Sequence, residues 1–128
     1  MTRYHACVWL DHREAKVFGI TKVDSEEIDI HDHHSPKHIH RKADHVGLGK
    51  AGPPHQFFAE IADALEPYRA ILITGPGTAR SEFAGYLVEH NAKIRARIWG
   101  IEPMDHPTKP ELIAAARKYF RAADPMHS

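Results

Sequence analysis

Residues 70–77 read Ala-Ile-Leu-Ile-Thr-Gly-Pro-Gly, and their pattern indicates the fold class. Residues 70–74 form a short apolar run, which is typical of a central strand covered on both faces. The Gly75-Pro76-Gly77 sequence predicts a tight turn, and Thr78 can cap a helix that follows it. A buried strand, a glycine turn and a helix in this order indicate an α/β domain.

The residues before this unit predict three strands. Residues 5–10 and 15–21 are rich in β-branched and aromatic side chains, and the polar residues 11–14 between them are of hairpin length. Residues 26–31 alternate, with Ile28 and Ile30 on one face and three polar side chains on the other. We therefore expect an antiparallel start to the sheet, with the third strand near an edge.

The rest of the chain predicts three helices and two strands. A helix is expected from Pro54 to Pro67, and a second one from Thr78 to about Asn91. Residues 96–101 are a further strand candidate, and Thr108 with Glu111 forms a capping box before the last helix. The predicted order is β-β-β-α-β-α-β-α in a single domain over residues 1–128. Right-handed crossovers would then give a five-stranded mixed sheet with helices on both faces, a three-layer arrangement.

Composition narrows the class of protein. The chain has 128 residues with 42% hydrophobic and 27% charged residues, as in an ordinary globular domain. Seventeen basic residues balance seventeen acidic ones, so the overall charge favours neither DNA nor an anionic membrane. Cys7 is the single cysteine, and no apolar segment is long enough to span a bilayer. We expect a cytoplasmic protein without a membrane partner.

The histidine content is unusual. The chain contains twelve histidines, and seven of them fall within residues 31–55. Residues 32–54 also contain several glycines and prolines, few large apolar side chains and no useful periodicity. A stretch of this length without regular structure is either a functional loop or a disordered one. We expect a long basic loop that stands away from the core.

Three interpretations of this loop remain open. As an RNA-contact arm, it would use cations on phosphates and imidazoles for stacking or added charge. As a metal site, it would use the i, i+2 spacing of its histidines to hold zinc or nickel, although paired cysteines are absent. As a solvated loop, it would do nothing by itself. The RNA-binding candidates are Lys37, His38, His40, Arg41, Lys42 and Lys50, and the metal-binding candidates are His31, His33, His38 and His40.

Several short segments resemble a known family of translation proteins. They are Val8-Trp9-Leu10-Asp11, Ala15-Lys16-Val17-Phe18, Phe58-Ala59-Glu60-Ile61, residues 73–77 with Ser81-Glu82-Phe83, and residues 100–108. Together with the element order, they resemble the ribonuclease-H-like middle domain of archaeal and eukaryotic peptide-chain release factors and of Pelota-type ribosome rescue proteins. The chain looks closer still to small single-domain bacterial translational machinery proteins.

The resemblance also implies what this chain lacks. In release factors, the loop before the first helix carries a Gly-Gly-Gln tip that assists hydrolysis of peptidyl-tRNA. Here Ala51-Gly52-Pro53 takes that place, and proline has neither the side-chain amide nor the backbone N–H to position water. We therefore expect a non-catalytic protein that binds the ribosome, rRNA or tRNA, with metal binding as the alternative and peptidyl-tRNA hydrolysis disfavoured.

Three further candidate features carry weaker signals. The turn formed by Gly75, Gly77, Thr78 and Arg80 could hold an anion at a helix start, although it lacks the full spacing of a nucleotide-binding loop. Asp11 and Asp105 could belong to a ribonuclease-H-type metal site, but Thr74-Gly75 stands where a further carboxylate would be needed. Residues 26–31 could form an exposed edge that pairs with another copy of the chain.

Overall fold

The computed structural model describes residues 5–20, 25–31 and 55–127. Within these ranges, no helix is both long enough and apolar enough to cross a membrane. The elements, in chain order, are β1 (His5–Leu10), β2 (Glu14–Ile20), β3 (Ser25–His31), α2 (His55–Leu65), β4 (Ala70–Gly75), α3 (Ala79–His90), α4 (Ala92–Arg95), β5 (Ile98–Pro103) and α5 (Lys109–His127).

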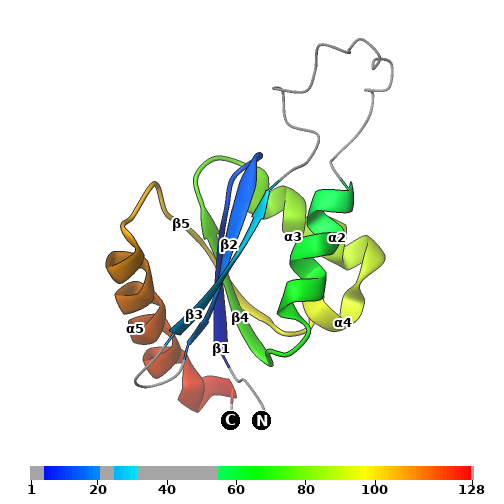
Figure 1. The fold of residues 1–128 in the computed structure, drawn as a ribbon. Coiled ribbons are helices and arrows are strands. Elements are labelled where there is room, and N and C mark those ends of the chain that lie inside the picture. Colours follow the sequence, from blue (N-terminus) through cyan, green and yellow to red (C-terminus); the bar gives the residue numbers. More distant parts are fainter. Residues whose placement is uncertain (1–4, 21–24, 32–54, 128) are drawn as a thin grey trace.

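The strands form one mixed sheet in the order β3-β2-β1-β4-β5 (Figure 1). β1 pairs antiparallel with β2, and β2 pairs antiparallel with β3, as expected for two successive hairpins. β4 lies parallel to β1 and to β5, and the chain reaches β4 through α2 and β5 through α3 and α4, as parallel strands require. The predicted fold class and five-stranded mixed sheet are confirmed.

Helices cover both faces of this sheet, so the domain has three layers (Figure 1). On one face, the strands pack against α2, α3 and α4 through a core that includes Phe58, Phe83 and Ile94. On the other face, α5 packs through Leu112 and Phe120 onto apolar side chains of the strands. β4 is buried along its whole length because it lies inside both layers.

The third strand forms as its sequence predicts, but of the two isoleucines expected on its apolar face only Ile30 is buried, whereas Ile28 is 41% exposed at the sheet edge. Ile30 is buried on the α2 side of the sheet, whereas Glu27 lines a pocket on the α5 side. The strand is at an edge of the described sheet. β2 and β3 each begin one residue before the predicted bounds, a difference within the usual uncertainty of strand ends.

The predicted capping box at α5 is confirmed. The backbone N–H of Thr108 donates to Glu111 Oε1 at 2.9 Å, and the N–H of Glu111 donates to Thr108 Oγ1 at 3.3 Å. Thr78 also occupies an N-cap position, at the start of α3, but its side chain makes no capping hydrogen bond. Its hydroxyl donates instead to Glu82 Oε2 at 2.9 Å.

Two differences from the prediction lie between α3 and α5. The segment after Asn91 forms a short helix, α4, because the Asn91 side chain accepts from the N–H of Ile94 and Ile94 is buried. This extra turn moves the final strand along the chain, so that β5 spans Ile98–Pro103 rather than residues 96–101. The long loop expected at 32–54 lies outside the described residues.

Candidate functional site at the carboxyl end of the sheet

The carboxyl ends of the three mutually parallel strands β1, β4 and β5 meet at one end of the sheet. Leu10, Gly75 and Pro103 are the last residues of these strands. The antiparallel register brings β3 to the same end, because Glu14 pairs with His31. Ligands of α/β domains commonly bind at the carboxyl ends of the strands. Of the features singled out in the sequence, the turn after β4, Asp11 and His31 therefore lie at the same end of the sheet.

The glycine turn after β4 is held closed by an arginine. Gly75 has a φ of 143° and Gly77 a φ of 62°, so both positions favour glycine. The Arg80 guanidinium donates to the carbonyl oxygen of Gly75 at 2.8 Å and to that of Gly77 at 2.6 Å. Arg80 thus stabilises the turn from within, and anion binding at this turn stays a prediction.

A carboxylate stands at the start of α3 beside the same turn. Glu82 accepts the Thr78 hydroxyl, and its other oxygen lies 3.0 Å from His12 Nε2 on the β1–β2 hairpin. His12 and Glu82 are both well exposed, with 55% and 43% of their side-chain surfaces accessible. The pair connects the hairpin tip to α3 and places negative charge near the helix N-terminus.

The two aspartates considered for metal-dependent hydrolysis have different local roles. Asp11 Oδ1 accepts the backbone N–H groups of Arg13 and Glu14 at 2.8 and 2.9 Å, so it shapes the hairpin turn. Asp105 lies 3.1 Å from His106 Nδ1 in the exposed loop before α5. On β4, Thr74 is buried, and its hydroxyl donates to the carbonyl oxygen of Val8.

Cys7 is buried in β1. Burial raises the pKa of its thiol to about 12, and a hydrogen bond with Thr74 opposes this only in part. A neutral, inaccessible thiol is a packing group and not a nucleophile.

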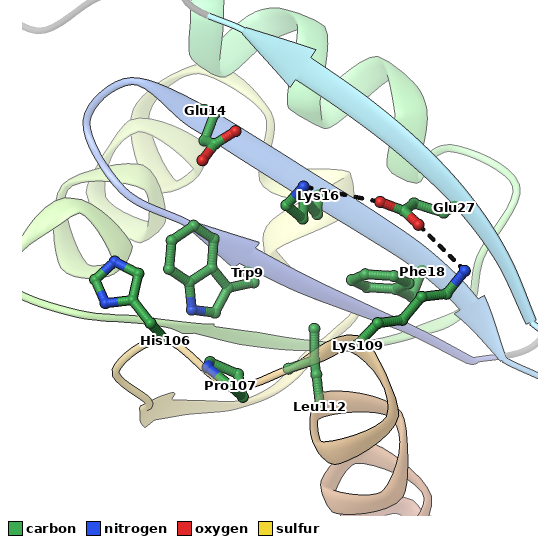
Figure 2. Close-up of a pocket in the computed structure, with 9 residues that line it drawn as sticks. All are labelled: Trp9, Glu14, Lys16, Phe18, Glu27, His106, Pro107, Lys109 and Leu112. Carbon is green, nitrogen blue, oxygen red and sulfur yellow. Dashed lines mark ion pairs between the residues drawn. The ribbon is translucent and has the colours of Figure 1, made fainter.

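A pocket of about 240 Å³ opens beside this end, between the α5 face of the sheet and the start of α5 (Figure 2). Its floor and walls come from three strands, the loop before α5, and the first turn of that helix. The lining residues are Trp9, Glu14, Lys16, Phe18, Glu27, His106, Pro107, Lys109 and Leu112.

The loop before α5 is fixed above the pocket through Trp9. The indole Nε1 of Trp9 donates to the carbonyl oxygen of Asp105 at 2.9 Å, and its ring centroid lies 5.3 Å from that of His106. Trp9 itself is only 5% exposed, so it packs in the sheet and does not offer an open stacking face.

Charged side chains of both signs border the pocket in one row (Figure 2). Glu27 lies 3.2 Å from Lys109 Nζ and 3.9 Å from Lys16 Nζ. Lys109 Nζ also lies 6.0 Å from the centre of the Phe18 ring. Sequence reasoning missed this pocket, because its residues come from segments about 90 positions apart.

Most of the predicted binding residues fall outside the described part of the chain. Among the RNA- and metal-binding candidates, His31 is the exception: it ends β3, with its Nδ1 3.9 Å from Glu14 Oε1. Within residues 5–20, 25–31 and 55–127, no group of three or more His, Cys, Asp or Glu side chains is arranged to hold a metal ion. The RNA and metal predictions both stay predictions. The residues outside the described ranges are His33, Lys37, His38, His40, Arg41, Lys42 and Lys50.

Comparison with known proteins gives a clear result for the fold alone. No protein-family model and no curated protein matches the sequence. Among solved structures, Pelota from Archaeoglobus fulgidus superposes with a TM-score of 0.63 at 16% identity, over 92% of this chain and 32% of Pelota. This chain has a Pelota-like fold.

Two further structures extend the Pelota-like similarity. The archaeal translation termination factor aRF1 has a TM-score of 0.58 at 12% identity, over 96% of this chain and 39% of aRF1. Dom34 from S. cerevisiae has a TM-score of 0.55 at 16% identity, over 96% of this chain and 37% of Dom34. The similarity to release factors and Pelota proteins is confirmed at the level of fold, and the chain spans about a third of their length. The closer resemblance to bacterial single-domain proteins stays a prediction.

Proposed function

We propose that this protein is a non-catalytic, cytoplasmic, translation-associated protein that binds the ribosome, rRNA or tRNA through residues 32–54. The support is the Pelota-like fold. The similar structures include a translation termination factor, aRF1, and Dom34, a translation termination-like factor involved in RNA quality control. The similarity extends over nearly all of this chain, and the shared fold is therefore the observation that carries the proposal.

The position of residues 32–54 in the chain supports this role. The segment leaves β3 at His31 and returns at His55, where α2 begins. Both the hairpin of β1 and β2 and the turn after β4 end at the side of the sheet where His31 lies. His31, the last described residue before the segment, therefore lies at the carboxyl end of the sheet, where ligands of α/β domains commonly bind.

The chemistry of the segment fits an RNA partner. With its histidines neutral, the segment has four cationic and two anionic side chains, a surplus of two positive charges. They are Lys37, Arg41, Lys42 and Lys50, and Asp32 and Asp44. Such a surplus attracts the phosphate backbone and makes binding depend on salt. His38 and His40 would add charge at lower pH or stack on unpaired bases.

Peptidyl-tRNA hydrolysis is not part of the proposal. Residues 51–53 are Ala-Gly-Pro, and Pro53 offers no amide group to position water. What remains is a Pelota-like domain with a basic segment between β3 and α2 in the chain.

The test is co-sedimentation of the untagged protein with ribosomes over a range of salt concentrations. We expect binding at low salt that weakens as the salt concentration rises. The charge-reversal variant Arg41→Glu/Lys42→Glu should bind ribosomes at least tenfold more weakly, because two phosphate contacts become repulsive. The matched control is Arg69→Glu/Lys93→Glu. It makes the same change of charge at two exposed positions near the opposite end of the sheet, and should bind like the unchanged protein.

Three results would contradict the proposal: no binding at low salt, equal binding by both double variants, or full binding after deletion of residues 35–52. Thermal unfolding of each variant shows whether the domain stays folded. A hydrolysis assay on peptidyl-tRNA should show no activity above buffer.

A second candidate function is binding of zinc or nickel by the candidate ligands His31, His33, His38 and His40. The observation that favours it is the exposed imidazole of His31, 64% accessible and 3.9 Å from the Glu14 carboxylate, at the point where the His-x-His pattern begins. Elemental analysis of untagged protein that has never touched a metal resin decides this. One metal per chain, lost in a His31→Ala/His33→Ala variant, supports it; far less than one metal per chain rejects it.

A further inference from the structure

We propose that the pocket between the strands and the start of α5 binds a free α-amino acid with an apolar side chain of medium size. This site goes beyond the proposed ribosome binding and does not depend on it. It is formed entirely by described residues, on the α5 face of the sheet (Figure 2).

The charges that line the pocket fit a ligand carrying both signs. Glu14 and Glu27 contribute two carboxylates, and Lys16 and Lys109 contribute two ammonium groups, so the lining has no net charge apart from His106. A nucleotide or other polyanion would find no surplus of cations there. A zwitterion has no net charge either. Its ammonium group can pair with a carboxylate of the lining, and its carboxylate can pair with an ammonium group.

Two of the four charged groups keep hydrogen-bonding capacity toward a ligand. Lys16 Nζ lies 3.9 Å from both Glu27 and Asp29, and Glu14 Oε1 lies 3.9 Å from His31 Nδ1. These separations exceed the roughly 2.7–2.9 Å of a direct charged hydrogen bond. In contrast, Lys109 Nζ is 3.2 Å from Glu27, so this pair is much closer to a direct bond.

Glu14 and Lys16 are also correctly spaced for one small ligand. They are two residues apart on β2, so their side chains project from the same face of the sheet with Cα atoms about 6.6 Å apart. An α-amino acid carries its ammonium and carboxylate on a single carbon. Both groups can therefore be contacted at once, the ammonium by Glu14 and the carboxylate by Lys16.

The rest of the pocket limits the size of the ligand. Its volume of about 240 Å³ is below the roughly 300–1,000 Å³ that holds a drug-sized molecule. Phe18, Pro107 and Leu112 supply the apolar part of the lining. A side chain such as that of leucine fits this combination, whereas a nucleoside would need the stacking face that buried Trp9 does not offer.

The experiment follows the indole N–H signals by NMR during titration with L-leucine. The chain has two tryptophans, and the Trp99→Phe variant identifies which signal belongs to Trp9. We expect the Trp9 signal to shift saturably with leucine in the millimolar range, because Trp9 lines the pocket, while the Trp99 signal stays in place.

Two ligand analogues and two variants test the charge requirement. Isoamylamine lacks the carboxylate and 4-methylpentanoate lacks the ammonium, and each should bind at least about tenfold more weakly than leucine. Lys16→Gln and Glu14→Gln should weaken the binding of leucine to a similar extent. The exposed control variants Lys118→Gln and Glu89→Gln should not.

The analogues use the unchanged protein, so the test holds even if a variant unfolds. No saturable shift, equal affinity for leucine and both analogues, or a shift of Trp99 instead of Trp9 would overturn the proposal. Because none of these measurements involves ribosomes, their failure leaves the proposed function to its own test.

Discussion

The indole Nε1 of Trp9 donates a hydrogen bond of 2.9 Å to the backbone carbonyl oxygen of Asp105, 96 residues further along the chain. This bond joins the centre of the sheet to the loop before α5. It holds in place the residues that form one wall of the pocket, His106 and Pro107. The acceptor is a backbone atom, so the contact depends on Trp9 and not on the side chain at position 105.

We expect Trp9→Phe to lower the free energy of unfolding by about 2 kcal/mol, because a partly buried carbonyl loses its donor and the smaller ring leaves a gap. Urea unfolding followed by circular dichroism measures this. Asp105→Ala is the control, since it keeps the carbonyl and removes only an exposed carboxylate, and it should cost less than about 0.5 kcal/mol. Equal costs for the two variants would contradict the assignment.

The two N-cap threonines should differ in their contribution to stability. Thr108→Ala removes half of a reciprocal capping box and should cost about 1 kcal/mol. Thr78→Ala removes only an exposed hydroxyl that donates to Glu82, and should cost less than about 0.5 kcal/mol. Thermal unfolding of both variants under the same conditions checks the order, and a larger loss for Thr78→Ala would refute it.

The two glycines of the turn after β4 should respond differently to alanine. At Gly75, an added Cβ would overlap the backbone oxygen of Leu10 at an already unfavourable φ, so Gly75→Ala should cost more than about 3 kcal/mol. At Gly77, the added Cβ meets nothing within 4 Å, and only the left-handed backbone opposes it, at about 1–2 kcal/mol. Chemical denaturation of the two variants is the measurement. Similar losses would show that the turn can move away from Leu10.

Alkaline pH should destabilise the domain through Cys7. Burial raises the pKa of this thiol from 9.0 to about 12, so the folded state holds the proton more tightly than the unfolded state. The stabilisation is complete below pH 9 and is lost as the pH rises from about 9 toward 12. Unfolding free energies measured at several pH values test this, and Cys7→Ala should show a flatter decline.

Tyr119 acts in the same direction, because burial and the nearby Glu102 carboxylate raise the pKa of its hydroxyl. Tyr119→Phe in the Cys7→Ala background therefore separates the two groups.

A thiol reagent should label Cys7 only as fast as the domain opens. Rapid labelling of the folded protein would contradict its burial.

The sequence predicted the order of the main elements because their signals are local. Each pattern involves residues only a few positions apart in the sequence. Examples are the apolar run at 70–74, the alternation at 26–31 and the capping box at Thr108. α4 escaped prediction, because four residues are too few to show helical periodicity and its stability comes from Asn91 and buried Ile94. At Thr78 the acidic partner, Glu82, is four residues away instead of three, which is one position too far for a capping box.

The site was less predictable than the fold for a physical reason. The pocket arises only when α5 docks on the strands, so Lys16 of β2 and Lys109 of α5 have no shared pattern in the sequence. The histidine-rich segment shows the opposite case. Its composition stands out in the sequence, yet its binding role depends on a partner and stays a prediction.

The placement of the first strand and the last helix has a practical consequence. The rings of His5, at the start of β1, and Phe120, in the second half of α5, lie 4.3 Å apart, at the end of the sheet opposite to Gly75 and His31. An affinity tag, a fluorophore or a surface tether joined before β1 or after α5 would therefore emerge together on that remote side. A molecule attached to a surface through either terminus would expose the carboxyl end of its sheet to ligands in solution.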